Sequence, residues 1–370
     1  MICTVVGARP NFMKMAPVIL EAKRRGVPQI FVHTGQHYDT AMSAIFAEEL
    51  GMPHPDVYLG VGSGSHAEQT ARVMVQFEQV CLEHRPRLVV VAGDVNSTLA
   101  CALTAAKLGI AVGHLEAGLR SFDRSMPEEI NRVLTDHVSD LLFTSEKSGD
   151  ENLLREGIAE EKIHFVGNCM IDSLRSHLAA ALAREPWRGF EVDPGAYALV
   201  TLHRPGVVDE SDHLEELRQA LMEVGRLIPI IFPTHPRTRK RIDQTGQDWA
   251  PVRLAEPLGY LDFLGLMAKA RLVLTDSGGI QEETTALGVP CLTLRENTER
   301  PITVEIGTNR VVGTSGEAII AAAQRALTVS RLDAQLPELW DGQAARRVID
   351  VLDRWMAGRG TPGAGHLTRA

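Results

Sequence analysis

The sequence predicts an α/β protein with two Rossmann-like domains. Short apolar runs alternate with amphipathic segments along the chain, the alternation pauses near 168–172, and 370 residues exceed what one ordinary core supports. We expect domains at 1–170 and 171–352, with the end of the last helix and a disordered tail at 353–370. Because ligands bind at the carboxyl ends of parallel strands, we also expect a cleft between the domains.

In the first half, each expected strand is a short apolar run, and each expected helix repeats its apolar positions every three or four residues. The expected strands are Ile2–Val6, Ile30–Thr34, Leu88–Ala92, Ala111–His114, Leu141–Thr144 and Ile163–Val166. The expected helices are Lys14–Arg25, Ala67–His84, Thr98–Leu108, Glu128–Val138, Lys147–Glu156 and an alanine-rich one that ends at Arg184.

The second half repeats this alternation, which is typical of parallel sheets with crossover helices. The expected strands are Ala198–Leu202, Pro229–Pro233, Val252–Leu254, Leu272–Thr275, Cys291–Leu294 and Arg310–Val312. The expected helices are His213–Leu227, Leu261–Ala270, Gln281–Leu287, Glu317–Leu327 and Gln343–Met356.

Composition argues against several classes of function. The net charge of −9, without a long basic run, argues against a nucleic-acid partner. No run approaches the ~20 apolar residues of a membrane span, and the N-terminus resembles a strand rather than a signal peptide. The five cysteines lie far apart, which favours buried free thiols and a cytoplasmic location. The histidines show no metal-ligand spacing, so we expect no metal site.

The segment Gly7–Lys14 runs from the first expected strand into a helix. Arg9 and Lys14 flank the N-terminus of this helix, where backbone amides and the helix dipole favour an anion. A phosphate or diphosphate is the expected ligand. The structural alternative is a surface loop with an exposed lysine.

Three carboxylates follow or flank expected strands of the first half. Asp94 follows Gly93 at the end of one strand, Glu116 follows the next strand, and Glu128 lies at the start of a helix. If they converge, mutual repulsion and partial burial would raise at least one pKa, which suits acid–base chemistry near neutral pH. The alternatives are a helix-capping cluster around Asp94 and a solvated charged loop at 113–132.

The second half carries polar groups at two strand ends. His203 and Arg204 follow its first strand, where a structural histidine and a diphosphate contact are both open interpretations. Further on, the segment Asp276–Glu283 brings backbone amides to a helix N-terminus, which is suited to an anion. Glu283 is suited to accept hydrogen bonds from ribose hydroxyls, and Arg300 adds positive charge nearby. A nucleoside diphosphate is the expected ligand, and a capped helix with solvated glutamates is the alternative.

Together these motifs resemble those of the non-hydrolysing UDP-N-acetylglucosamine 2-epimerases. The likeness spans residues 2–352 and lies in Gly7–Lys14, Gly93–Thr98, His114–Arg120, Met126–Arg132, His203-Arg204, Asp276–Glu283 and Asn297–Pro301. The resemblance implies the glycosyltransferase-B-like fold of two Rossmann-type domains, as in UDP-glycosyltransferases and glycogen phosphorylase. It also implies the interconversion of UDP-N-acetylglucosamine and UDP-N-acetylmannosamine without a cofactor.

The resemblance also assigns residues by position. It makes Asp94, Glu116, Glu128 and His203 the catalytic candidates. The candidates for holding UDP are Arg9, Lys14, Phe263, Ser277, Gly278, Gly279, Glu283 and Arg300. The chain departs from the family pattern at three places: Leu258-Gly259 stands where many members carry a UDP-contacting Gln, Gly206-Val207 where polar residues are usual, and Asn11 where Glu is frequent.

The implied reaction eliminates UDP to give 2-acetamidoglucal, then adds UDP back with protonation of the other face of C2. The resemblance further implies a homodimer that supplies N-acetylmannosamine-type sugars for cell-surface polysaccharide. Four alternatives stay open: an epimerase for a UDP-2,3-diacetamido sugar, a glycosyltransferase of the same fold, a hydrolysing epimerase, and a binding module without turnover.

Regulation by a second substrate molecule is a further implication, because bacterial members are often activated by UDP-N-acetylglucosamine beside the active site. The candidate contacts are Gln36, His37, Gln69 and Arg204. Because Gly206-Val207 removes polar side chains next to Arg204, we predict weakened or absent activation. The alternative for Gln36 and His37 is that they cap a helix that starts near Thr40.

Overall fold

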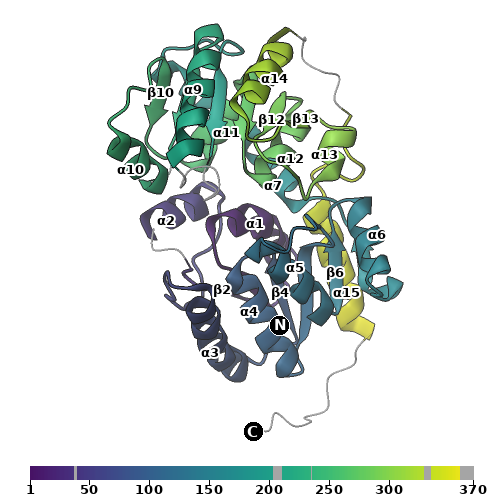
Figure 1. Ribbon diagram of the computed structural model, residues 1–370. Helices are drawn as coiled ribbons and strands as arrows, with labels where there is room; N and C mark the ends of the chain where they lie inside the picture. The colour runs from purple at the N-terminus through teal and green to yellow at the C-terminus, as the bar shows by residue number, and fades with distance from the viewer. Residues whose placement is uncertain (37–39, 203–210, 235, 329–334, 359–370) are drawn as a thin grey trace. The chain divides into compact units, whose positions relative to one another are not determined.

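The computed structural model describes residues 1–36, 40–202, 211–234, 236–328 and 335–358. The chain divides into two compact units, each an α/β layer structure (Figure 1). Unit 1 consists of Met1–Ser173 and the C-terminal segment that begins at Glu338, and unit 2 consists of Leu174–Pro337.

Unit 1 contains, within the described residues, a seven-stranded parallel sheet in the order β3-β2-β1-β4-β5-β6-β7. Its strands are β1 (Ile2–Val6), β2 (Gln29–His33), β3 (Val57–Tyr58), β4 (Leu88–Ala92), β5 (Ala111–Ala117), β6 (Leu141–Thr144) and β7 (Ile163–Phe165). The strand order reverses between β1 and β4, and ligands of open α/β sheets bind beyond the carboxyl ends of the strands at such a point.

Helices connect successive strands of unit 1 (Figure 1). They are α1 (Arg9–Arg24), α2 (Thr40–Glu49), α3 (His66–His84), α4 (Asn96–Lys107), α5 (Pro127–Val138), α6 (Lys147–Arg155) and the short 3₁₀ helix η1 (Glu160–Lys162). The boundary between the units falls within α7 (Cys169–Ala183). Strands β1 and β4 are buried along their whole length, as expected for central strands covered on both faces.

Unit 2 repeats this topology with the order β10-β9-β8-β11-β12-β13 among its described residues. The strands are β8 (Ala198–Thr201), β9 (Ile230–Pro233), β10 (Val252–Ala255), β11 (Leu272–Thr275), β12 (Cys291–Thr293) and β13 (Asn309–Val311). The helices are η2 (Pro186–Phe190), α9 (Ser211–Leu227), α10 (Pro236–Thr245), α11 (Tyr260–Lys269), α12 (Gly278–Leu287), α13 (Pro301–Glu305) and α14 (Gly316–Thr328). The order again reverses, between β8 and β11.

The C-terminal helix α15 (Ala344–Gly358) packs against α1 and is part of unit 1. Arg25 at the end of α1 donates to Asp350 at 2.6 Å, and Asp172 accepts the first backbone amides of α15. The sequence division at residue 170 keeps this helix with the second domain, whereas its contacts group it with the first. The predicted tail beyond Gly358 lies outside the described residues.

The structure confirms the predicted α/β class with two Rossmann-like sheets, and it differs from the sequence interpretation at element ends. Helix α1 begins at Arg9 rather than Lys14, because Pro10 fits the first turn, where its missing N–H is not needed. Strand β5 continues past His114 to Ala117 through an irregular register and includes the charged residue Glu116. Both differences lie at the predicted site.

Candidate active site

Glu116 lies on an irregular part of β5 at the carboxyl edge of the unit 1 sheet. The register with β6 shifts between Leu115 and Ala117, and Glu116 takes a φ of +69°. Positive φ is unfavourable for a residue with a Cβ and tends to occur at functional sites. The side chain is 7% exposed and forms an ion pair with Lys14 of α1, whose side chain is 9% exposed. The bulge therefore directs a carboxylate at a buried cation.

Gly93 provides the space for this pair. Its φ is +65°, and a Cβ at this position would lie 3.0 Å from Lys14 Nζ and 3.4 Å from Glu116 Oε2. Asn11 donates to the Ala92 carbonyl at 2.8 Å and accepts the Ala8 amide at 3.0 Å. The start of α1 is thus fastened to the end of β4 by the Asn11 side chain.

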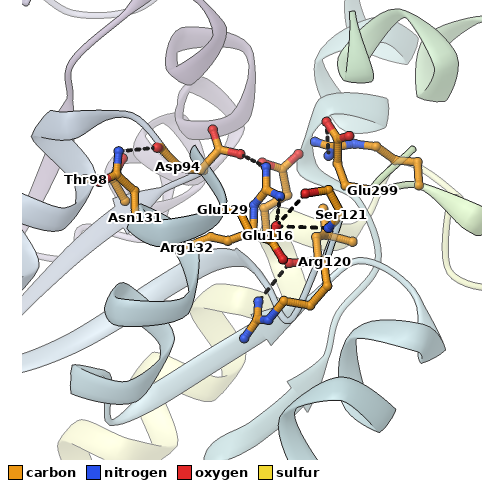
Figure 2. Close-up of polar contacts among 12 residues, drawn as sticks. Asp94, Thr98, Glu116, Arg120, Ser121, Glu129, Asn131, Arg132 and Glu299 are labelled. Atoms are coloured by element: carbon orange, nitrogen blue, oxygen red, sulfur yellow. Dashed lines mark hydrogen bonds and ion pairs between the residues drawn. The ribbon is translucent and has the colours of Figure 1, made fainter. Parts of the chain in front are cut away.

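Asp94 follows directly and is held by α5. Figure 2 shows Asp94, Asn131 and Arg132 directed toward one another. The Arg132 guanidinium forms an ion pair with Asp94 Oδ2, and Asn131 Nδ2 donates to the Asp94 carbonyl at 2.9 Å. Lys14 and Arg132 therefore offset the carboxylate repulsion that the sequence predicts. The sequence interpretation assigned no role to Arg132 or Asn131.

The paired glutamates at the start of α5 differ in their surroundings. Glu129 is 3% exposed, accepts the Ser121 and Phe122 amides at 2.9 Å, and forms an ion pair with Arg132 (Figure 2). Glu128, the predicted catalytic residue, is partly exposed, and its side chain makes no hydrogen bond within the described part of the chain. Glu129 and Arg132 lie one helical turn apart in the sequence. This spacing could have predicted the ion pair between them.

The N-terminus of α1 carries the predicted anion-binding groups. Arg9 is the first residue of the helix, and its guanidinium carbon lies 4.7 Å from the ring centroid of Phe46 in α2. The first turn contains no acidic residue and the N-cap, Ala8, offers no side-chain acceptor. An anion is therefore favoured there by the amides and the dipole.

In unit 2, the predicted anion cradle opens α12 at the switch point of the sheet. Ser277 is the N-cap and does not use its side chain to cap the helix. A Cβ on Gly278 would lie 2.7 Å from Glu299 Oε1 and 3.2 Å from Arg300 Cζ, so Arg300 packs against this helix end with its acidic neighbour. Gly279 continues the first turn. Arg300 is 3% exposed and is balanced by Glu299 at 3.2 Å and Glu282 at 3.3 Å.

Glu283 is buried one turn further along α12. It is 2% exposed, and Tyr260 of α11 donates to its Oε1 at 3.4 Å. Burial, followed by the charge of Glu282, raises the pKa of Glu283 to about 8. The group therefore holds a proton at neutral pH. Phe263, the predicted contact to the base, lies on the same helix as Tyr260 and is partly exposed.

The proposed regulatory residues Gln36 and Gln69 are buried in unit 1. Gln36 Oε1 accepts the Ser97 amide at 3.1 Å and the Ser97 hydroxyl at 2.8 Å, so its side chain contacts the start of α4 instead of capping α2. Gln69 donates to the Gln36 carbonyl at 3.1 Å. The other candidates, His37, His203 and Arg204, lie outside the described residues.

All five cysteines are buried free thiols. Among the described residues, no group of three or more His, Cys, Asp or Glu side chains is arranged to bind a metal ion. A search of the same residues finds no helix with the length and apolarity needed to cross a membrane.

Comparisons with known proteins agree on one family. The family model described as UDP-N-acetylglucosamine 2-epimerase matches residues 20–353. A UDP-N-acetylglucosamine 2-epimerase of Methanocaldococcus jannaschii is 44% identical over 358 residues, which cover 94% of this chain and 97% of the relative. A UDP-2,3-diacetamido-2,3-dideoxy-D-glucuronate 2-epimerase of Pseudomonas aeruginosa is 42% identical and covers 95% of this chain and 99% of its own.

A solved structure supports the same grouping. The crystal structure of Methanocaldococcus jannaschii UDP-GlcNAc 2-epimerase in complex with UDP-GlcNAc and UDP superposes with a TM-score of 0.89 at 44% identity. The match covers 95% of this chain and 99% of that chain.

Proposed function

The chain belongs to the UDP-N-acetylglucosamine 2-epimerase family and has its glycosyltransferase-B-like fold of two Rossmann-like domains, and we propose that it interconverts UDP-N-acetylglucosamine and UDP-N-acetylmannosamine. The observation that carries this proposal is the set of acid–base groups at the carboxyl edge of the unit 1 sheet. Glu116 and Asp94 each face a buried cation there, beside a helix N-terminus suited to a diphosphate.

Inversion at C2 needs activation, because no carbonyl group neighbours C2 and its proton is only weakly acidic. Cleavage of the bond between C1 and the diphosphate builds oxocarbenium character, which weakens the C2–H bond. Loss of the C2 proton together with UDP gives 2-acetamidoglucal. Re-addition of UDP at C1, with a proton delivered to the other face of C2, completes the epimerisation and requires no redox cofactor.

We assign the proton transfers to Asp94, Glu116 and Glu128, with His203 as a further catalytic residue. Lys14 and Arg9 are suited to stabilise the negative charge of the departing diphosphate, since cations placed where charge develops lower the barrier. In this role Lys14 serves both the diphosphate and Glu116. The strained backbone at Glu116 fits a group whose orientation is fixed before the substrate binds.

We assign the UDP contacts of unit 2 to α12 and its surroundings. The Ser277 hydroxyl and the backbone amides of Gly278 and Gly279 are suited to donate hydrogen bonds to phosphate oxygens, together with Arg300. Glu283 binds the ribose hydroxyls, and Phe263 packs near the base.

A time course of purified protein with UDP-N-acetylglucosamine, followed by proton NMR, tests the function. We expect UDP-N-acetylmannosamine to accumulate to an equilibrium that is reached from either side. Release of free N-acetylmannosamine with UDP would identify a hydrolase instead. Turnover only with an added sugar acceptor would identify a glycosyltransferase, and binding without turnover would leave only a binding module.

A second substrate is supported by the Pseudomonas aeruginosa relative, which is named for a UDP-2,3-diacetamido sugar acid and is nearly as similar as the Methanocaldococcus jannaschii enzyme. The direct comparison is kcat/KM for UDP-N-acetylglucosamine and for the diacetamido glucuronate under identical conditions. A higher value for the diacetamido sugar would reassign the substrate while leaving the C2 chemistry unchanged.

We further propose a cytoplasmic homodimer that supplies N-acetylmannosamine-type sugars for cell-surface polysaccharide. The five buried free thiols are consistent with a reducing compartment. Light scattering of the purified protein tests the dimer. Loss of N-acetylmannosamine from surface polysaccharide after deletion of the gene would test the pathway.

We also propose that activation by a second UDP-N-acetylglucosamine is weak or absent. Gln36 and Gln69 already use side-chain atoms in hydrogen bonds within unit 1. Initial rates from UDP-N-acetylmannosamine, with and without trace UDP-N-acetylglucosamine, measure the coupling. A pronounced lag that trace UDP-N-acetylglucosamine abolishes would contradict this proposal.

A further inference from the structure

A fully buried histidine on β5 contacts the backbone just beyond the end of β4. His114 of β5 is 0% exposed, and its Nε2 lies 2.8 Å from the Gly93 carbonyl oxygen. Its Nδ1 lies 2.7 Å from Asp136 Oδ1 of α5. A carbonyl oxygen can only accept a hydrogen bond, so Nε2 carries a hydrogen. The state of Asp136 then decides whether Nδ1 carries one as well.

Asp136 is ionised in this environment. Its Oδ2 accepts the Gly118 amide at 3.1 Å and lies 2.7 Å from Arg120 Nη1. Burial alone would raise the pKa of Asp136, but the neighbouring His114 and Arg120 more than offset this, and its pKa lies below the usual value. Arg120 and the Gly118 amide favour the carboxylate form of Asp136 independently of the ring. An ionised carboxylate accepts, so Nδ1 donates too, and the ring is an imidazolium.

The charges of this cluster balance. Arg120 also donates to Glu156 through Nε at 2.8 Å and Nη2 at 2.7 Å, and the Glu156 side chain is 27% exposed. Two acidic and two basic groups therefore alternate from the surface to the buried ring of His114. Such pairing is what makes a buried charge tolerable.

The imidazolium and its carboxylate partner both fasten backbone at the candidate active site. The Gly93 carbonyl belongs to the peptide group whose nitrogen is that of Asp94, so the bond from His114 sets the plane from which Asp94 projects. Asp136 holds the Gly118 amide, two residues beyond Glu116. One buried pair thus reaches the backbone beside two of the predicted catalytic carboxylates.

We propose that His114 is a positioning residue of the reaction, a buried imidazolium that fixes the Gly93–Asp94 peptide and thereby the Asp94 carboxylate. It touches neither substrate nor reacting atoms. Small displacements of catalytic groups are costly in rate, so this bond acts on kcat more than on KM. The kinetic part rests on the proposed function, whereas the charge state of the ring does not.

Two substitutions separate the two hydrogen bonds. His114→Asn keeps a donor at the place of Nδ1, toward Asp136, and loses the bond to Gly93. His114→Gln keeps a donor near the place of Nε2, toward Gly93, and loses the bond to Asp136. Both remove the same positive charge, so both disturb the buried charge cluster. Leu142→Ala, on the strand paired with β5 at the same height, is the control for a destabilised core.

We expect His114→Asn to lower kcat by about 10- to 100-fold with KM for UDP-N-acetylglucosamine within about 3-fold. His114→Gln should recover about 10-fold of that loss, and Leu142→Ala should turn over as the wild type does. Equal kcat in the two histidine variants, or wild-type kcat in His114→Asn, would overturn the proposal. Failure of the wild type to epimerise would instead count against the proposed function.

If the variants do not fold, NMR of the wild-type protein with nitrogen-15-labelled histidine decides the matter. We expect both ring nitrogens of His114 to carry hydrogens, because each of them faces a hydrogen-bond acceptor. A neutral ring with one unprotonated nitrogen would refute the imidazolium, whatever the enzyme's activity.

Discussion

The carboxyl groups of the two units are held in opposite ways. In unit 1, Glu116 and Asp94 each form an ion pair with a largely buried cation supplied by a helix. In unit 2, Glu283 lies beside Glu282 and the Tyr260 hydroxyl, and burial raises its pKa to about 8. The difference fits the proposed roles of the two units: unit 1 fixes the charge and orientation of the groups that we propose to move protons, whereas unit 2 keeps neutral the carboxyl that we propose to bind ribose.

The largest expected effect is on the pH dependence of stability. The native state keeps the proton of Glu283 up to about pH 8, while the unfolded chain loses it above the ordinary value of 4.5. Stability from this group is therefore lost as pH rises between these two values, by a total on the order of 5 kcal/mol.

Glu283→Gln should remove this dependence, so chemical denaturation should show a variant that gains stability relative to wild type from about pH 5 to about pH 8.5. Parallel curves for the two proteins over this range would show that Glu283 is ionised in the native state and would end the contrast between the units.

The next effect concerns the cation of unit 1. Arg132→Met leaves Glu129 and Asp94 without their shared guanidinium, and removing one partner of a buried pair costs about 3–5 kcal/mol. Urea denaturation at neutral pH measures the change, with Arg72→Met on the exposed face of α3 as the control. A loss no greater than that of the control would mean that Arg132 does not hold the site.

We expect kcat to fall when the proposed catalytic carboxylates of unit 1 are replaced by neutral amides. Asp94→Asn and Glu116→Gln should each lower kcat by about 10²-fold or more, the usual scale for losing an acid or base. Glu161→Gln, at an exposed carboxyl of η1, is the matched control. Near-normal kcat in both site variants would remove these residues from the catalytic set.

The smallest effect is expected for substrate binding in unit 2. Glu283→Ala should raise KM by about 10-fold and leave kcat nearly unchanged, because ribose contacts are the same in the ground and transition states. Steady-state kinetics at one pH are sufficient. A fall in kcat that saturating substrate does not restore would place Glu283 in the chemistry and contradict the division between the units.

The sequence was sufficient for the strands and for the edge of the sheet where the site lies. The bounds of β1, β4 and β11 agree with the expected ones, because a strand buried on both faces is an uninterrupted apolar run. The ends of these apolar runs also placed Gly93-Asp94 directly after β4 and Asp276–Glu283 directly after β11. The polar residues His114 and Glu116 hid the extension of β5 to Ala117, because they interrupt the apolar run while the backbone pairing with β6 continues.

The sequence did not predict which side chains form ion pairs or hydrogen bonds with one another. Lys14 and Glu116 are 102 residues apart, and nothing in either motif identifies the other as its partner. The choice between Glu128 and Glu129 as the buried residue depends on the rotation of α5 about its axis, which one residue shifts by about 100°. Likewise, the raised pKa of Glu283 depends first on its burial in the folded unit, which no motif in the sequence reveals.

The most direct test of the central claim is the appearance of deuterium at C2 when UDP-N-acetylglucosamine at saturating concentration is converted in deuterated water. We predict full incorporation in UDP-N-acetylmannosamine by the wild type, a nearly equal rate for Glu283→Ala, and a rate about 10²-fold lower for Glu116→Gln. Complete retention of the original hydrogen, or slow exchange in Glu283→Ala with normal exchange in Glu116→Gln, would contradict the account.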